Sequence, residues 1–384
     1  MKIAMIGQKG IPARSGGIER HVEELSAELV SRGHEVLVFC RAWYIWPIRN
    51  HRGVRCLKAP TIQTKHFDAI VHTFTSIILA AREKVDVFHI HGVGPALLAW
   101  LPKLLRPSAK VVVTFHCIDR HHQKWNWFAR LMLGLGERAA VYLPDATITV
   151  SKTLEAYCRM NYSANTKYIP NGAQIPLESA DAKLLEPFHL TPGNYLLFCA
   201  RLVKHKGPHL LIKAWKQIQA KRPELVKGKK LAIVGGSAFT DSYVEQLKKQ
   251  AEGDESIVLT GTQTGDTLHS LFLYSYAMVH PSESEGLPIA VLEGMSYGKC
   301  VLSSDIPENL ELTQEHGLSF RRGNVKELAD QMIMMLEQPD LVHAVGQEAR
   351  KCIAKQYDWK DIAETTDYLY QLVQLEPELE NIKI

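Results

Sequence analysis

Short, almost uninterrupted runs of β-branched and other apolar residues recur along the chain, and segments with a helical period separate them. In the first half these runs occupy residues 2–7, 35–40, 85–92, 110–117 and 146–151. Between the first two runs, Val22, Leu25, Leu29 and Val30 repeat at helical spacing, and Gly33 ends the pattern. Apolar strands that alternate with helices are typical of a parallel sheet covered on both faces, so we predict an α/β, Rossmann-like domain.

The alternation starts again after a connection rich in proline, asparagine and glycine at residues 166–176. The later apolar runs occupy residues 194–201, 230–236, 256–261, 277–282 and 299–304. We predict a first domain over residues 1–178, a second over 179–356 and a terminal helix over about 357–384. Two parallel sheets in tandem can turn their strand C-termini toward each other across a cleft, which suits a ligand made of two parts.

The composition is that of a folded protein and narrows the class further. A chain of 384 residues with 46% hydrophobic and 22% charged residues is long enough for two domain cores. Its apolar stretches fall short of the roughly 20 residues that span a bilayer, and its start does not resemble a signal peptide. The seven cysteines are scattered without a C-x-x-C motif, which is typical of reduced thiols. We therefore expect a cytoplasmic protein.

The net charge of +4 is divided unevenly between the two halves. Residues 1–180 contain 23 Lys/Arg and 13 Asp/Glu, a balance of +10, whereas residues 181–384 contain 22 and 28, a balance of −6. The basic half has no dense Lys/Arg run and no nucleic-acid motif, so we do not expect nucleic acid as a partner. A solvated basic surface and an anionic membrane surface both remain open explanations.

Two stretches of the basic half mix aromatic with basic residues, at 40–52 and 121–138. Trp and Tyr favour bilayer interfaces, and Arg and Lys favour anionic headgroups, so these stretches predict peripheral docking on a membrane. The alternative is that Trp125, Trp127 and Phe128 belong to the core or to an acceptor pocket.

Glycine-rich loops follow the first strand of each predicted domain. In the first domain, the amides of Gly16 and Gly17 precede a helix and suit a phosphate group, although the spacing matches neither G-x-G-x-x-G nor a P-loop and a plain turn stays open. In the second domain, Arg201 and Lys206 lie between a strand and a helix. Two cations at that position can bind a diphosphate and stabilise its charge as it departs.

The segment 282–294 contains an acid near each end of an apolar run. Its pattern predicts a strand, a loop and a helix that begins near Pro288. Glu285 then lies in the loop, where its carboxylate can accept hydrogen bonds from sugar hydroxyls, and the amides of Gly286 and Leu287 lie at the N-terminus of the helix. Glu293 lies within the helix among apolar residues, where the two hydroxyl groups of a ribose would satisfy its carboxylate.

These motifs together resemble retaining glycosyltransferases of the two-Rossmann-domain (GT-B) type, family four in particular. The resemblance rests on "ESEGLPIAVLEGMS" as an E-x7-E signature, "ARLVKHKG", "SGGIERHVEEL", "VVVTFHCID" and "YIPNGAQI", which follow one another in the family's order along nearly the whole chain. "EGLPIAVLEGMS" and "SSDIPENLEL" depart from the commonest forms, which leaves the identity of the sugar open.

The resemblance implies a role for each matching residue. Arg201 and Lys206 should bind the donor diphosphate, Glu285 the transferred sugar, and Glu293 the nucleotide ribose. Gly16 and Gly17 should lie on the phosphate side of the site, with Gly286, Leu287 and Pro288 also contacting the donor, and His116 should contact the donor sugar or the acceptor. The first domain would bind the acceptor, the second the nucleotide sugar, and the terminal helix would cross back to the first domain.

The family also implies transfer with retention of the anomeric configuration, without a divalent metal and without an obvious protein nucleophile. The acceptor would be a saccharide or a lipid-linked saccharide, as in polysaccharide assembly at the inner face of a bacterial membrane. The nucleotide (UDP, GDP or dTDP) stays open. So do three other functions: a nucleotide-sugar epimerase, a phosphorylase, for which no pyridoxal lysine can be identified, and an idle sugar-nucleotide-binding scaffold.

Histidines concentrate at the predicted strand ends of the first domain. His89 and His91 should share one strand face, and His116, His121 and His122 follow within the next part of the chain. Such a group could ligate a metal. The alternative, which we prefer because these strand ends are where the family places its substrate, is that neutral imidazoles form hydrogen bonds.

Overall fold

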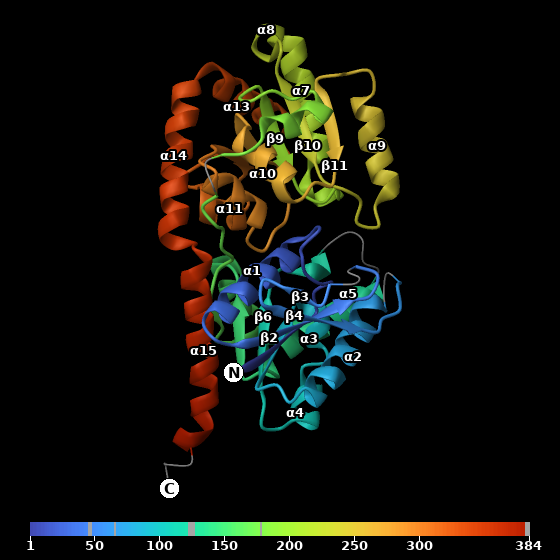
Figure 1. Cartoon of the computed structure of the whole chain (residues 1–384). Helices are drawn as coiled ribbons and strands as arrows, with labels where there is room; N and C mark the ends of the chain where they lie inside the picture. The colour runs from blue at the N-terminus through green and yellow to red at the C-terminus, as the bar shows by residue number, and fades with distance from the viewer. Residues whose placement is uncertain (45–47, 65–66, 122–126, 177–178, 381–384) are drawn as a thin grey trace. The chain divides into compact units, whose positions relative to one another are not determined.

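The computed structural model describes residues 1–44, 48–64, 67–121, 127–176 and 179–380. The chain forms two compact units, each with its own parallel sheet (Figure 1). Unit 1 comprises Met1–Ala13, Gly17–Asn171 and Trp359–Ile384, and unit 2 comprises Arg14–Gly16 and Gly172–Asp358. Apart from the short segment Arg14–Gly16, the chain changes unit after Asn171 and after Asp358, where the sequence pattern placed the changes after residues 178 and 356.

Unit 1 contains an eight-stranded sheet in the order β3-β4-β2-β1-β5-β6-β7-β8. All its neighbouring pairs are parallel except the β3–β4 hairpin at one edge. The strands are β1 (Lys2–Ile6), β2 (Glu35–Arg41), β3 (Asn50–His51), β4 (Val54–Ala59), β5 (Val87–His91), β6 (Lys110–Phe115), β7 (Ala146–Thr149) and β8 (Lys167–Tyr168). The helices are α1 (Gly17–Ser31), α2 (Asp68–Arg82), α3 (Val93–Ala96), α4 (Trp100–Leu105), the 3-10 turn η1 (Asp119–His121), α5 (Trp127–Tyr142), α6 (Lys152–Tyr162) and α15 (Trp359–Glu380).

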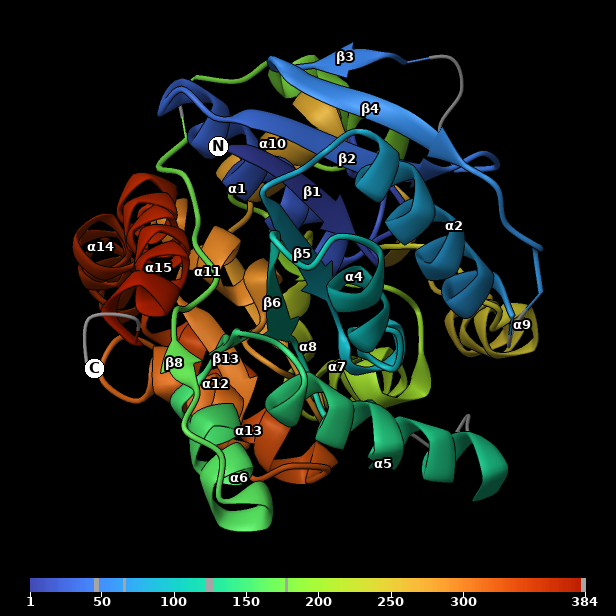
Figure 2. The ribbon, with the colours of Figure 1, turned by 90° about the horizontal axis from the view of Figure 1, so that it is seen from below.

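The C-terminal helix α15 packs into the core of unit 1, as predicted. Its residues Trp359, Ile362 and Tyr370 are buried in one cluster with Val22 and Leu25 of α1. The hydroxyl of Tyr370 also forms a buried hydrogen bond of 2.6 Å with Nδ1 of His89 on β5. The helix is thus held by apolar packing between Trp359 and Val373 and by one buried polar contact, and Figure 2 shows it beside unit 1's helix α1.

Unit 2 contains a six-stranded, fully parallel sheet in the order β11-β10-β9-β12-β13-β14. Its strands are β9 (Tyr195–Cys199), β10 (Lys230–Val234), β11 (Ile257–Gly261), β12 (Ala277–His280), β13 (Val301–Ser304) and β14 (Leu318–Phe320). Its helices are η2 (Ala182–Phe188), η3 (Lys204–Lys206), α7 (Pro208–Lys221), α8 (Pro223–Val226), α9 (Asp241–Ala251), α10 (Gly265–Leu273), α11 (Ile289–Ser296), α12 (Pro307–Thr313), α13 (Val325–Glu337) and α14 (Pro339–Gln356).

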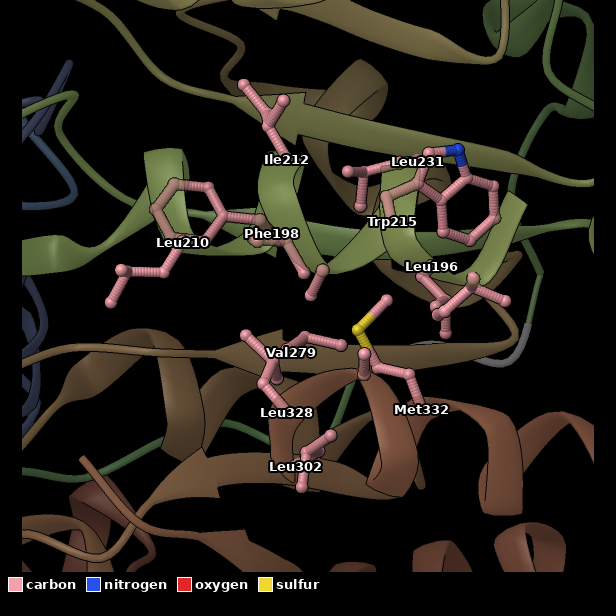
Figure 3. Packing of buried hydrophobic residues seen from close by; sticks show 14 of the residues in the cluster. Leu196, Phe198, Leu210, Ile212, Trp215, Leu231, Val279, Leu302, Leu328 and Met332 are labelled. Atoms are coloured by element: carbon pink, nitrogen blue, oxygen red, sulfur yellow. The ribbon is translucent and has the colours of Figure 1, made fainter. Parts of the chain in front are cut away.

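The core of unit 2 lies between the sheet and the helices α7 and α13. Trp215 of α7 is fully buried against strand residues, and its indole N–H donates a hydrogen bond to Ser256 Oγ at 2.8 Å. Figure 3 shows Trp215 and Leu210 of α7, the strand residues Phe198 and Val279, and Leu328 and Met332 of α13 in one packed group. The continuous apolar strands thus bury their side chains, as the sequence pattern predicted.

The structure adds four strands that the apolar pattern does not show: β3, β4, β8 and β14. All four lie at or next to a sheet edge, and the residues of β4 alternate between buried and partly exposed positions. A strand with one solvated face carries polar residues at every second position, so it lacks the continuous apolar run that marks a central strand.

Candidate active site

The sheet of unit 2 has a point where the strand order reverses, between β9 and β12. The chain runs from β9 to β10 and β11 on one side, and then returns to place β12 on the other side of β9. In open α/β sheets, ligands bind outside the carboxyl ends of the strands at such a point. The two loops that leave this point are those after β9, which contains Arg201 and Lys206, and after β12, which contains Glu285.

Gly207 lets these two loops run against each other. Its φ of +74° lies in the left-handed region, and a Cβ atom here would come within 2.2 Å of the carbonyl oxygen of Pro281. Only glycine fits this backbone conformation at such a close approach. Next to it, the amide of Glu283 donates a hydrogen bond to the carbonyl of His205 at 2.7 Å. The β9 loop is therefore joined to the β12 loop by backbone contacts.

Lys206 and Glu285 form an ion pair where the two loops meet. The Nζ atom of Lys206 lies 2.6 Å from Oε1 and 2.5 Å from Oε2 of Glu285. The side chains are largely buried, with exposed fractions of 15% and 6%. Burial by itself raises the pKa of Glu285, but the charge of Lys206 and a hydrogen bond from His280 outweigh it and hold the pKa well below its usual range. Glu285 is therefore a carboxylate at every physiological pH.

His280 is the site residue that the sequence analysis missed. It is the last residue of β12, its side chain is 1% exposed, and its Nε2 lies 2.8 Å from Oε1 of Glu285. A carboxylate only accepts, so Nε2 carries a hydrogen, and the other ring nitrogen is Nδ1. That Nδ1 has no hydrogen-bond partner in the described part of the chain. The only sequence signal was a polar residue at the end of an otherwise apolar strand.

Arg201 and Glu293 lie around the same strand end. Arg201 comes two residues after β9 and is partly buried, and Glu293 lies in α11, as predicted, and is also partly buried. Burial raises the pKa of the Cys199 thiol at the end of β9, and the nearby carboxylate of Glu293 raises it further. The structure therefore brings Glu293 close to the strand that leads into Arg201. Their roles toward a diphosphate and a ribose remain predictions.

Gly286, Leu287 and Pro288 form the end of the β12 loop and are buried. Pro288 is the N-cap of α11, with a φ of −74° and a ψ of 107°, so the helix begins at Ile289, one residue later than a first-turn proline would place it. The loop thus leads directly into the N-terminus of α11, where unpaired backbone N–H groups favour an anion or a hydroxyl oxygen.

Unit 1 has its own reversal of strand order, between β1 and β5. The loop after β1 is fixed to α1, because Glu19 accepts a hydrogen bond from the amide of Lys9 at 3.1 Å and Glu23 accepts one from the amide of Ala13 at 3.0 Å. At the end of this loop Gly16 has a φ of +104°, and Gly17 is the first residue of α1. The loop and helix N-terminus are placed as predicted, and their role toward a phosphate remains a prediction.

Four buried histidines gather at the carboxyl ends of β5 and β6. His91 Nδ1 lies 3.1 Å from His116 Nε2, and His89 is hydrogen-bonded by Thr114 and Tyr370, which makes His89 part of the core and not of a site. The ring planes of His89 and His91 lie side by side, as their shared strand face predicted. His21 on α1 completes the group and donates from Nδ1 to the amide oxygen of Asn171 at 2.9 Å. His122 and Trp125 lie outside the described residues.

This histidine cluster is neutral at physiological pH. Burial lowers the pKa of His21 to about 4, although the bond to Asn171 opposes the shift. Burial also lowers the pKa values of His89, His91 and His116 to well below 6.5, and the neighbouring imidazoles lower them further. His21, His91 and His116 could present three nitrogen atoms within 4.8 Å of one another to a metal ion. The same atoms could equally bond sugar hydroxyls, and the metal-free expectation stays a prediction.

Comparison with known proteins agrees with this architecture. Residues 15–175 match the family described as Glycosyltransferase Family 4, and residues 186–352 match the family described as Glycosyl transferases group 1. A sulfoquinovosyl transferase from Arabidopsis thaliana is 32% identical, over 94% of this chain and 71% of its own. A phosphatidylinositol N-acetylglucosaminyltransferase subunit from Schizosaccharomyces pombe is 23% identical, over 93% and 78%. The Anabaena protein HepE, solved with UDP-glucose, has a TM-score of 0.78 at 17% identity, covering 97% and 99%.

The two Rossmann-like units and the two family matches define a glycosyltransferase of the GT-B class. The chain belongs to glycosyltransferase family 4, as its sequence motifs predicted. No helix in the described ranges has the length and apolar character needed to cross a membrane.

Proposed function

We propose that this protein is a retaining glycosyltransferase that moves a hexosyl-type sugar from a nucleotide sugar to a saccharide or lipid-linked saccharide. Unit 2 binds the donor and unit 1 binds the acceptor. The observation that carries this proposal is the buried Lys206–Glu285 pair at the switch point of unit 2. The HepE complex with UDP-glucose supports a nucleotide-sugar donor for a chain of this fold.

Lys206 acts on the leaving group in this mechanism. As the glycosidic bond breaks, negative charge develops on the departing diphosphate, and an ammonium group already fixed by Glu285 stabilises that charge without reorganising. Arg201, on the same loop, adds a second cation with planar donors that suit phosphate oxygens. Glu285 keeps its carboxylate charged and can accept hydrogen bonds from the hydroxyls of the transferred sugar. The chemistry therefore rests on positioning and charge stabilisation.

Retention and independence of divalent metal are part of the proposal and can be tested together. The anomeric configuration of the product, read from its proton NMR coupling constants, should equal that of the donor. Transfer should continue in excess EDTA, because Lys206 and Arg201 supply the positive charge at the diphosphate. A product of inverted configuration would overturn retention. Activity that disappears with EDTA and returns with Mg²⁺ would overturn independence of divalent metal.

We also propose that the protein meets its acceptor at the cytoplasmic face of a membrane. The fission yeast relative is named for transfer to phosphatidylinositol, and the Arabidopsis relative for transfer of sulfoquinovose. Trp127 and Phe128, for which the sequence left a membrane role, the core and an acceptor pocket open, are 77% and 56% exposed, so the core interpretation is wrong for both. We propose a peripheral protein that works on polysaccharide or glycolipid assembly.

The donor is tested first, by thermal shift of the purified chain with UDP, GDP, dTDP and their common sugar conjugates. We expect one nucleotide to raise the melting temperature of the wild type by mass action and to have little effect on Lys206→Ala and Glu293→Gln. The variants are measured against their own ligand-free melting temperatures, because each substitution changes stability by itself. If no nucleotide shifts the wild type at millimolar concentration, the donor assignment fails and an idle scaffold becomes the better description.

His280 should be a positioning residue for Glu285. His280→Leu removes a buried hydrogen bond to a charged group, a bond worth about 1.5–3 kcal/mol, so kcat/KM should fall roughly 10- to 100-fold. His280→Gln can keep an N–H donor at a similar reach and should recover much of the loss. The hydrogen bond from His280 is one of the interactions that lower the pKa of Glu285. In His280→Leu this pKa should rise, so the acid limb of the pH–rate profile should move to higher pH. An unchanged limb with reduced stability would indicate a purely structural role.

A further inference from the structure

A pocket lies in unit 1 at residues that belong neither to the donor site nor to the histidine cluster. It has a volume of about 310 Å³ and is lined by Arg120, Arg130, Arg138, Leu131 and Leu135, together with the end of α6. This volume is at the lower end of the range for small-molecule sites and fits a headgroup better than a whole nucleotide sugar. In Figure 2 the helix α5, which supplies most of these residues, extends along the outside of unit 1.

The pocket carries an excess of positive charge. Arg120 is held by buried Glu137 at 3.4 Å and donates to the hydroxyl of Tyr157 at 2.6 Å, so its guanidinium group is fixed in place. Within the described part of the chain, Arg130 and Arg138 form no ion pair and are exposed. Three guanidinium groups against one carboxylate leave a balance of two positive charges. Planar guanidinium groups bind phosphate oxygens in pairs, so the pocket suits a phosphate monoester or a diphosphate.

Gly134 lies between Arg130 and Arg138 on α5 and lines the pocket without a side chain. It is one helical turn from Arg130 and from Arg138, and an added Cβ atom would be 3.8 Å from Nη1 of Arg120. Glycine therefore leaves room beside the Arg120 guanidinium group.

Large apolar side chains lie on α5 close to the basic pocket. Trp127 and Phe128 on the first turn of α5 are 77% and 56% exposed, and Leu131 and Leu135 beside the arginines are 53% and 42% exposed. A helix that presents aromatic and aliphatic residues next to arginines is typical of a segment that lies in the interface of a membrane. A soluble phosphate compound would gain nothing from this apolar rim, whereas the chains of a lipid would cover it.

We propose that the α5 pocket, defined by Arg120, Arg130 and Arg138, binds the phosphate or diphosphate headgroup of a lipid while Trp127 and Phe128 enter the bilayer interface. This inference deepens the proposed function, on which it rests for the view that the acceptor is at a membrane. The pocket would hold the protein on anionic membrane and keep unit 1 next to lipid-linked acceptors. Its ligand chemistry is that of a terminal phosphate on an apolar anchor.

Flotation of the full chain with three kinds of vesicles tests the proposal: phosphatidylcholine alone, and phosphatidylcholine with equal fractions of either phosphatidic acid or phosphatidylserine. We expect no binding to the first and tighter binding to phosphatidic acid, whose phosphate is terminal, than to phosphatidylserine. Each arginine near an anionic surface contributes roughly a fivefold change in affinity, so Arg130→Ala/Arg138→Ala should weaken binding to phosphatidic acid by about 25-fold. Trp127→Ala/Phe128→Ala should weaken it while keeping all the charges.

The control variant Lys221→Ala/Lys227→Ala removes two exposed cations from unit 2 and should bind vesicles like the wild type. Unchanged binding in the arginine variant would overturn the proposal, as would an equal loss for both anionic lipids, which would indicate only a general basic surface. Binding of inorganic pyrophosphate without any binding to vesicles would assign the pocket to a soluble phosphate instead. Loss of a dimer in Trp127→Ala/Phe128→Ala, without loss of vesicle binding, would assign the apolar rim to a second copy of the chain.

The nucleotide thermal shift is measured on every variant in parallel. Because the substitutions are far in sequence from the donor loops, each variant should keep the shift of the wild type. A normal nucleotide shift without vesicle binding would overturn this inference and leave the proposed function standing. Vesicle binding without any nucleotide shift would overturn the proposed nucleotide-sugar donor and leave the lipid-binding pocket standing.

Discussion

Lys206→Met should lower kcat by about 10²–10³-fold, because it removes a fixed donor from the position where negative charge develops on the leaving group. It should also lower the free energy of unfolding of unit 2 by about 3 kcal/mol, since breaking a buried ion pair leaves the Glu285 carboxylate unpaired among buried groups. Initial rates and urea unfolding of the same preparation measure both effects.

The matched control for this prediction is Lys206→Met/Glu285→Gln. Removing both charges eliminates the unpaired carboxylate, so most of the lost stability should return, whereas transfer should stay as low as in Lys206→Met. The coupling between the two sites then separates the structural part of the pair from its catalytic part. If the double variant regains activity together with stability, Lys206 has no part in stabilising the leaving group.

Unit 1 should lose stability steeply as the pH falls from 6.5 to 4.5. Burial lowers the pKa of His72 to about 3 and of His21 to about 4, and it holds those of His89, His91 and His116 well below 6.5. Below pH 6.5 the unfolded chain therefore binds protons at these histidines while the folded chain does not, so acid favours unfolding. Each histidine that stays neutral in the folded chain adds up to about 1.4 kcal/mol per pH unit to the slope, a value reached where its unfolded form is fully protonated.

The free energy of unfolding, measured in urea at several pH values, checks this slope. His72→Leu should reduce it by about 1.4 kcal/mol per pH unit, because it removes one titrating group that lies outside the histidine cluster. Glu285 adds little to the slope above about pH 5, since its pKa is depressed and its contribution is lost as the pH falls from the usual range of a carboxyl group toward the lower folded pKa. A flat stability profile between pH 6.5 and 4.5 would show that the histidines are not neutral in the folded protein.

The sequence predicted the parts of the candidate site better than their connections. Lys206 and Glu285 could be placed on loops at strand ends, because glycine, proline and the apolar runs around them act locally. That the two side chains form one buried pair could not be predicted from spacing, since they are 79 residues apart and meet only because β9 and β12 are neighbours in the sheet. His280 escaped notice for the same reason, because a single polar residue at a strand end has no periodicity.

The edge strands of both sheets and the terminal helix also differ in how far the sequence alone predicted them. Strands β4 and β14 have partly exposed positions, so their patterns are too weak to separate them from loops. The terminal helix was evident from its period, and its return to unit 1 followed from resemblance. The structure adds the physical cause, which is apolar packing against α1 and a hydrogen bond between residues 281 positions apart, His89 and Tyr370.

By itself the sequence determined the two α/β units, the family and the loops on which the chemistry lies, because hydrophobic periodicity, turn residues and short motifs are local properties of the chain. Tertiary structure alone decided the charge state of Glu285 and the neutrality of the histidine cluster. These properties depend on burial and on contacts between distant segments. They arise only when the strand order of each sheet brings those segments together.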